Sequence, residues 1–229
     1  MTKFPGFPSD TIPFLKDLAA NNDRDWFAEN KGRYEAVVLE PSLEFIEAMQ
    51  QPLKKLSPHF LAVPKKVGGS LMRIYRNTRF SKDKAPYKTN IGIQFRHEFG
   101  SDIHAPGFYV HVAPDECFLG VGIWHPEKEP LQRIRQGILD DPSAWKKATQ
   151  SKAFTDVMKL GGDSLKRAPA DFDPTHPLIE DLKRKDYIAG GPLTVKEITS
   201  PQLIERLITR FKAGSALMKF LCRALEIPY

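Results

Sequence analysis

Apolar residues in the first third of the chain recur at helical spacing and predict three helices. A short helix follows Ser9 or Asp10, either of which can cap it by accepting a hydrogen bond from a free backbone N–H of its first turn. Asp23 can cap a second helix over residues 23–40. Pro41 fits the first turn of a third helix, where the missing N–H of proline is not needed.

In the middle of the chain the apolar period changes to two. Residues 71–76, 91–99, 108–114 and 117–124 alternate in this way and predict four strands. The last two are joined by the turn residues 114–116, with the sequence Pro-Asp-Glu. Such short connections favour antiparallel pairing.

Alternation sorts the side chains of these strands onto two faces. The first face is apolar and predicts the core: Met72, Ile74, Ile91, Ile93, Phe95, Phe108, Val110, Val112, Leu119, Val121 and Ile123. The second face is polar, basic and aromatic: Arg73, Tyr75, Gln94, Arg96, Tyr109, His111 and Trp124. Gly92, Gly120 and Gly122 lie between these side chains, and glycine weakens a strand unless something must approach the backbone closely. The second face is therefore a candidate binding surface.

The C-terminal half returns to helical spacing. A helix is predicted over 127–141, and shorter helical pieces over 142–160. Residues 161–177 are rich in Gly, Pro and Asp and predict a loop, and a further short strand is predicted at 186–190. A continuous apolar stripe over 203–225 predicts one long final helix that packs on the core.

These elements predict an α+β fold with a central, mostly antiparallel sheet and the N- and C-terminal helices packed on one face. The chain has 229 residues, of which 41% are hydrophobic and 27% charged, which is an ordinary globular composition. That length fits one large domain or two small ones, and we predict a single domain over residues 1–229.

The chain carries no sign of export or membrane insertion. Its first ten residues lack a charged segment followed by an apolar run, so no signal peptide is predicted. No apolar window approaches the ~20 residues that span a bilayer. The two cysteines, Cys117 and Cys222, lie far apart and have no CxxC partner, which is typical of a reduced, cytoplasmic protein.

Positive charge is concentrated in one segment. Residues 65–96 contain nine Lys or Arg residues and one acid, Asp83, whereas the whole chain has a net charge of +6. Within this segment, the stretch 76–90 (RNTRFSKDKAPYKTN) also places Phe80 and Tyr87 among its charges. A local positive field of this kind indicates a local anionic partner.

Several stretches resemble a widespread, mainly bacterial family, domain of unknown function 2461. The most specific is RFSKDKAPYK within RIYRNTRFSKDKAPYKTNIGIQF, and the others are FLKDLAANNDRDWFAENKGRYE, GFYVHVAPDECFLGVGIWHPE and KRKDYIAG. The resemblance spans nearly the whole chain and implies a single domain, but it supplies no reaction. Asn77 stands where the family pattern would have an acid, which weakens a catalytic role at that position.

The first functional hypothesis is a basic pocket between the polar sheet face and the 76–90 loop. It would bind a phosphate- or carboxylate-bearing small molecule, because Arg suits bidentate capture of such groups and Lys supplies a mobile charge. Hydrolytic or transfer chemistry on that ligand is an extension of the hypothesis. The predicted contacts are Arg73, Arg79, Lys84, Tyr87, Lys88, Gln94, Arg96, Tyr109 and Trp124. The competing interpretation is a solvated basic loop whose lysines point into water.

A second hypothesis is a module that binds single-stranded nucleic acid or RNA by phosphate neutralisation and base stacking. For an enzyme, His111 is the candidate acid–base group, because it lies on the polar face and cations beside it would keep it neutral. No nucleophile elbow, Walker loop or dinucleotide-binding turn is present, so no cofactor is predicted. His97, His104 and His111 are spaced by seven, which is not a metal-binding pattern, and no metal is predicted.

Overall fold

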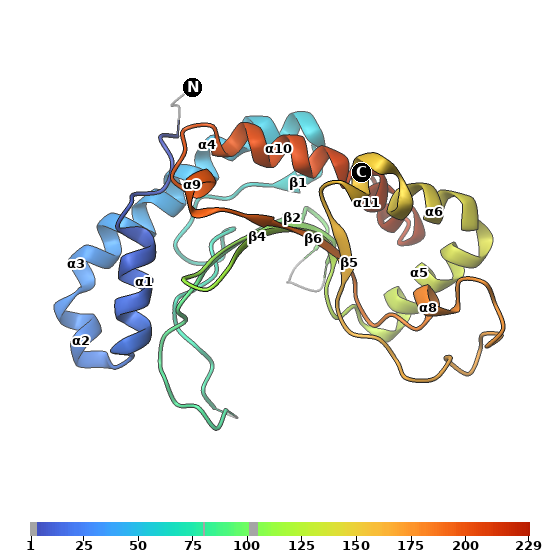
Figure 1. Ribbon diagram of the computed structural model, residues 1–229, viewed down its shortest axis with the longest axis horizontal. Helices are drawn as coiled ribbons and strands as arrows, with labels where there is room; N and C mark the ends of the chain where they lie inside the picture. Colours follow the sequence, from blue (N-terminus) through green and yellow to red (C-terminus); the bar gives the residue numbers. More distant parts are fainter. Residues whose placement is uncertain (1–3, 80, 101–104) are drawn as a thin grey trace.

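The computed structural model describes residues 4–79, 81–100 and 105–229. Within these residues the chain forms one six-stranded sheet of order β1-β2-β3-β4-β6-β5 (Figure 1). Every neighbouring pair in it is antiparallel. The strands are β1 Phe60–Leu61, β2 Ile91–His97, β3 Gly107–Val112, β4 Cys117–Ile123, β5 Lys159–Gly161 and β6 Tyr187–Leu193.

Helices precede and follow the central strands of the sheet. The N-terminal group comprises α1 Thr11–Ala20, α2 Arg24–Glu29, α3 Lys31–Tyr34, the π-helical turn η1 Glu35–Leu39 and α4 Glu40–Leu56. The later group comprises α5 Lys128–Asp140, α6 Pro142–Gln150, α7 Lys152–Thr155, α8 Ile179–Leu182, α9 Val195–Ile198, α10 Leu203–Ala213 and α11 Ser215–Ala224. The helices and the antiparallel sheet together confirm the predicted α+β class.

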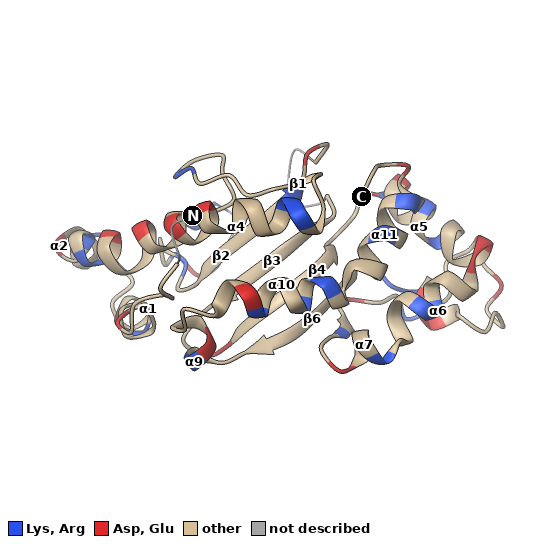
Figure 2. Cartoon of the chain, turned by 90° about the horizontal axis from the view of Figure 1, so that it is seen from above, with Lys and Arg blue, Asp and Glu red and all other residues tan. Residues whose placement is uncertain are grey.

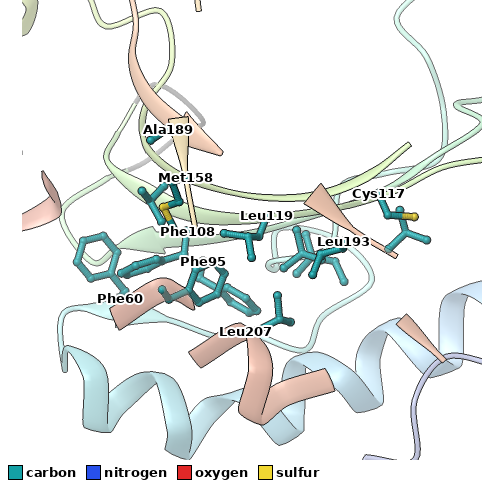
Figure 3. Close-up of a cluster of buried hydrophobic side chains, with 14 of the residues drawn as sticks. Phe60, Phe95, Phe108, Cys117, Leu119, Met158, Ala189, Leu193 and Leu207 are labelled. Carbon is teal, nitrogen blue, oxygen red and sulfur yellow. The ribbon is translucent and has the colours of Figure 1, made fainter. Parts of the chain in front are cut away.

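One face of the sheet is covered and the other is open. The sheet is arched, and α4 and α10 cross its convex face side by side (Figures 1 and 2). Between these two layers lies the hydrophobic core, where Phe95, Phe108 and Leu119 from the sheet face Leu207 of α10 (Figure 3). The concave face has no such helical layer among the described residues and is flanked by two long connections, before β2 and after β5 (Figure 1).

Two of the predicted helices are less regular than their spacing indicates. The helix predicted over 23–40 is divided into α2, α3 and the π-helical turn, which runs directly into α4. Pro41 accounts for the disturbance, because it has no N–H to donate to the carbonyl of Val37 four residues earlier. The hydroxyl of the fully buried Thr11 donates to that carbonyl instead, at 2.7 Å.

The long final helix predicted over 203–225 is broken at Gly214, between α10 and α11. A Cβ on Gly214 would lie 2.9 Å from a methyl group of Val121 and 3.2 Å from the sulfur of Met158. Glycine therefore allows the junction of the two helices to sit directly against β4.

The strand prediction is correct for β2, β3 and β4 and wrong for residues 71–76. That segment is extended but forms only isolated bridges, Leu71 to Ile93 and Tyr75 to Tyr87. Because it does not continue the sheet, Met72 lies against the concave face and not in the predicted core. The short strand expected at 186–190 is β6, a central strand of seven residues, and β5 falls where helix and loop were predicted.

The sequence predicts a cytoplasmic protein from its two isolated cysteines and from the lack of a long apolar segment. Cys117 and Cys222 are both buried free thiols. Burial raises the pKa of Cys222 to about 12, so this thiol stays protonated at neutral pH. Among the described residues, no helix has both the length and the apolar character needed to cross a membrane.

Replacing Thr11 with Val tests the role of its hydroxyl at the π-helical turn. The substitution keeps the shape of the side chain but removes the donor of a part-buried hydrogen bond, so we expect the free energy of unfolding to fall by about 1–2 kcal/mol. Thr209→Val is the matched control, since the Thr209 hydroxyl bonds the carbonyl of Glu205 on an exposed helix face. Its change should stay within about 0.5 kcal/mol in the same urea titration. Equal losses in the two variants would contradict this interpretation.

Candidate functional site

The concave face of the sheet contains a cavity of about 650 Å³. Strands β2, β3, β4, β5 and β6 all contribute to it, and the loop before β2 contributes Met72. The described residues that line it are Met72, Gln94, Gly107, Tyr109, Phe118, Gly120, Val121, Gly122, Trp124, Lys159, Leu160, Gly161, Ile188, Ala189 and Gly190. This composition is apolar and aromatic, with a few polar groups, as is typical of small-molecule pockets.

The strand register aligns the floor of the cavity in cross-strand rows. The first row runs from Gln94 to Tyr109, Gly120, Gly190 and Lys159. Residues in one row lie on one face of the sheet, so two side chains stand at one end, two glycines form the centre, and Lys159 stands at the other end. Of the two central glycines, Gly120 lies in β4 and Gly190 lies in β6, so only the pairing of these strands brings them together.

A second row, beside the first, runs through Gly107, Gly122, Ile188 and Gly161. Together the two rows place glycine at five positions of the floor. A Cβ on Gly120 would have no neighbour nearer than 3.7 Å, and one on Gly161 would have none within 4 Å. Gly120 and Gly161 therefore face empty space, which side chains at these two positions would fill.

Gly92, by contrast, is a glycine because of its protein neighbours. A Cβ there would lie 2.9 Å from both the sulfur of Met72 and the hydroxyl oxygen of Tyr109. The side chains that approach the backbone at Gly92 are therefore Met72 and Tyr109, which belong to the cavity wall. Gly92 allows Met72 and Tyr109 to close one end of the cavity.

Aromatic side chains form the wall at this end. The hydroxyl of Tyr109 lies 3.0 Å from Nδ1 of His111, and the His111 ring stacks on Phe118 with 4.6 Å between ring centroids. Burial, helped by the charge of Glu116, raises the pKa of Tyr109 to about 12. Burial also lowers the pKa of His111, while Glu116 and Asp115 act in the opposite direction. The sequence also predicts a neutral His111, but with neighbouring cations as the cause.

Lysine and arginine side chains lie in and beside the cavity. Lys159 is the charged side chain among the described lining residues, and it is exposed on the edge strand β5. Beside Met72, Arg73 lies near Lys88: burial, followed by the charge of Arg73, lowers the pKa of Lys88. No described carboxylate forms an ion pair with Arg73. These cations accompany a cavity interior that is mainly apolar.

The 76–90 loop is anchored through Tyr87, which was predicted to contact ligand. Its ring is buried and stacks on Phe27 of α2 with 4.1 Å between centroids. Its backbone exchanges two hydrogen bonds of 3.0 Å with the side chain of Asn22. Tyr87 thus joins the loop to the N-terminal helices.

Part of the positive charge of this loop is used within the loop. Arg76 pairs with Asp83, and Nζ of Lys84 donates to the carbonyl of Thr78 at 3.0 Å. The loop extends away from the sheet in Figure 1. Phe80, which was predicted to lie among these charges, falls outside the described residues.

The structure brings together three of the predicted contacts in the cavity, Gln94, Tyr109 and Trp124. The described lining does not include the other predicted residues, which are His111, Arg73, Arg79, Lys84, Tyr87, Lys88 and Arg96. Three lining residues, Phe118, Ile188 and Lys159, were not predicted from the sequence. Phe118 follows the same alternation as Gly120 and Gly122 and could have been found, whereas Lys159 lies in a strand of only three residues.

A metal site was not predicted. Among the described residues, no three His, Cys, Asp or Glu side chains gather where they could hold an ion. His97 points to the covered side of the sheet, where its Nε2 lies 2.8 Å from the carbonyl of Pro228. His104 falls outside the described residues.

The family model described as Conserved hypothetical protein (DUF2461) matches residues 10–220. The match covers nearly the whole chain, so the chain belongs to this family. Comparison with curated proteins and with solved structures found no match.

Two alanine substitutions distinguish glycines that face the cavity from those that the backbone requires. Gly122 has a φ of +123°, and a Cβ there would lie 2.1 Å from the carbonyl oxygen of Tyr187. Gly122→Ala should therefore lower the free energy of unfolding by roughly 2 kcal/mol or more. Gly120→Ala, two residues away on the same face, should change it by less than about 1 kcal/mol. Chemical denaturation measures both, and a similar loss in the two variants would be inconsistent with an empty space above Gly120.

Proposed function

We propose that this member of the DUF2461 family binds a small organic anion in the concave cavity of its sheet. The ligand would have a flat, mainly apolar body and a carboxylate or phosphate group. The observation that carries the proposal is a cavity of about 650 Å³ with a glycine floor, aromatic walls and a lysine at one end. That volume lies within the usual range for small-molecule sites, roughly 300–1,000 Å³.

The floor and walls favour a flat ligand. The central glycines Gly120 and Gly190 raise no side chain from the floor, so a planar group can lie close to the backbone. Tyr109, Phe118 and Trp124 offer ring faces and edges to such a group. The carboxamide of Gln94, which lies over Gly107, supplies a polar group that can orient the ligand.

The charges favour an anion. Lys159 stands at the end of the floor row and can follow an anionic group with its flexible stem. Arg73 and Lys88 at the other side add to the positive potential that draws an anion towards the concave face. In this proposal the basic segment acts through its field, and Lys159 makes the direct contact.

Binding of single-stranded nucleic acid is the alternative. Ring faces beside a basic loop on a sheet support it, because bases stack on aromatic side chains while cations neutralise phosphates. A cavity of this size accommodates a single base or nucleotide. An oligonucleotide would have to continue over the 76–90 loop, and its affinity would fall steeply with salt.

Thermal denaturation against a ligand panel tests the proposal. The panel contains inorganic phosphate, aromatic carboxylates, aryl phosphates, nucleotides, sugar phosphates and short single-stranded DNA and RNA. A ligand at a hundred times its dissociation constant stabilises the protein by about 2.7 kcal/mol. For a chain of this length that corresponds to a rise in Tm of roughly 5–10 °C. We expect such a rise with an aromatic carboxylate or aryl phosphate and none with inorganic phosphate.

Two variants locate the binding. Lys159→Met should remove most of the shift, whereas Lys196→Met, which changes an exposed lysine outside the cavity lining, should retain it. Gly120→Leu should block the cavity and abolish binding without changing the charge. A shift that occurs only with oligonucleotides and disappears in salt would favour the alternative. A shift that survives Gly120→Leu would contradict binding in the cavity.

A further inference from the structure

A second polar constellation lies where β4 ends and β6 begins. Asp186 precedes β6, is 1% exposed and accepts three hydrogen bonds. Its Oδ1 accepts from the backbone N–H of His125 at 2.7 Å and lies 2.6 Å from Nδ1 of the same residue. Its Oδ2 accepts from the backbone N–H of Asp163 at 2.7 Å. A buried carboxylate thus holds the imidazole of His125 in a defined orientation.

This pair borders the concave cavity. The indole of Trp124, which lines the cavity, stacks on the His125 ring with 4.2 Å between centroids and 14° between planes. On the neighbouring strands, the lining residues Gly161 and Ile188 lie within two residues of Gly162 and Asp186. His125 is not itself among the lining residues, so its imidazole lies beside the cavity, in contact with a lining ring.

The backbone around the pair adopts conformations that few residues tolerate. His125 has a φ of 46°, which is uncommon for a residue other than glycine. Gly162 has a φ of +86°, and a Cβ there would lie 2.4 Å from Cβ of Asp186. A residue other than glycine is kept at positive φ only where the surrounding structure holds it there, and such residues cluster at functional sites.

The hydrogen bonds define which nitrogen of His125 can react. Burial alone would raise the pKa of Asp186, but hydrogen bonds from Asp163 and His125 outweigh it and hold the pKa below its usual range. The carboxyl group is therefore ionised at neutral pH, so it accepts a hydrogen bond from the N–H at Nδ1 of His125. In the neutral tautomer with its proton on Nδ1, Nε2 carries the lone pair, and no described residue bonds to it on a ring that is 45% exposed.

We propose that His125 is a catalytic general base for the hydrolysis of a carboxylic ester bound in the cavity, with Asp186 as its positioning residue. A water proton moves to Nε2 while the water oxygen bonds to the ester carbonyl carbon. The bond from that carbon to the alcohol oxygen then breaks, and Nε2 returns the proton to the alcohol oxygen. Ester and water become acid and alcohol, and Asp186 stabilises the transient imidazolium.

The inference rests on the proposed function, because the ester would be the flat, anionic ligand of the cavity. Mono(4-nitrophenyl) terephthalate matches that description, and its hydrolysis is followed by release of 4-nitrophenolate. The neutral 4-nitrophenyl benzoate is the comparison substrate, since it is equally flat but lacks the carboxylate for Lys159. We expect hydrolysis of the terephthalate ester above the spontaneous rate, with a lower KM than for the benzoate.

His125→Asn is the principal variant, since asparagine tolerates positive φ and should preserve the fold. Loss of a general base typically lowers the rate by 10²–10⁴-fold, so kcat should fall at least about 100-fold. His59→Gln is the matched control, because His59 also lies 2.6 Å from a carboxylate, Glu98, but its ring stacks on His97 and not on a cavity-lining residue. Its kcat should be unchanged. Lys159→Met should raise KM.

Asp186→Asn tests the positioning role and has a readout that does not depend on turnover. In the wild type, long-range ¹H–¹⁵N correlation spectra should show neutral His125 with its proton on Nδ1. In the variant we expect loss of this single tautomer together with a fall in kcat. A neutral wild-type ring with its proton on Nε2 would overturn the assignment.

Binding of terephthalate, the unreactive product, separates the two proposals. If terephthalate raises the Tm of His125→Asn as it does that of the wild type, but the wild type does not hydrolyse the ester, the catalytic inference is wrong and the binding proposal stands. Equal hydrolysis by the wild type and His125→Asn would also overturn the catalytic role. If no member of the ligand panel, terephthalate included, raises the Tm and the ester is not hydrolysed, both proposals fail.

Discussion

The pairing of β4 with β6 is the contact on which the rest of the structure depends. It joins strands that lie far apart in the sequence, and it aligns Gly120 with Gly190 and Gly122 with Ile188. On the convex side the same pairing brings Leu119 and Leu193 into the core with α10. On the concave side it leaves a floor without large side chains, and at its end it brings Asp186 to His125. One set of backbone hydrogen bonds thus positions the core, the cavity and the histidine–carboxylate pair.

Half of this arrangement could be predicted from the sequence. Alternation along β2, β3 and β4 assigns Gln94, Tyr109 and Trp124 to one face, because local periodicity alone decides which face a strand residue occupies. The other half depends on β5 and β6, whose pairing is not encoded by a short turn. A strand of three residues has no period to detect, and Lys159 could not be placed opposite Gly190 without the fold.

The basic segment shows the limit of composition as a guide. Its charges could not identify the residues that line the cavity, since charge acts over distance whereas a pocket is defined by packing. Arg76 and Lys84 are used inside the loop, and Tyr87 packs against Phe27. The reciprocal bonds between Asn22 and Tyr87 tie together residues 65 positions apart, which no local pattern predicts. The loop is thus held by its aromatic and polar contacts with the N-terminal helices.

Two histidines stand near the concave face, and their surroundings suit them to different tasks. His111 was chosen from the sequence because alternation placed it on the polar face, yet its Nδ1 faces the hydroxyl of Tyr109 and burial favours its neutral form. His125 follows the last residue of β4, and its partner Asp186 is 61 positions away, so only the fold reveals the pair. The hydroxyl beside His111 carries no charge that could stabilise a developing imidazolium. The buried, ionised carboxylate beside His125 does. By this argument His111 shapes the wall through Tyr109 and Phe118, and proton transfer belongs to His125.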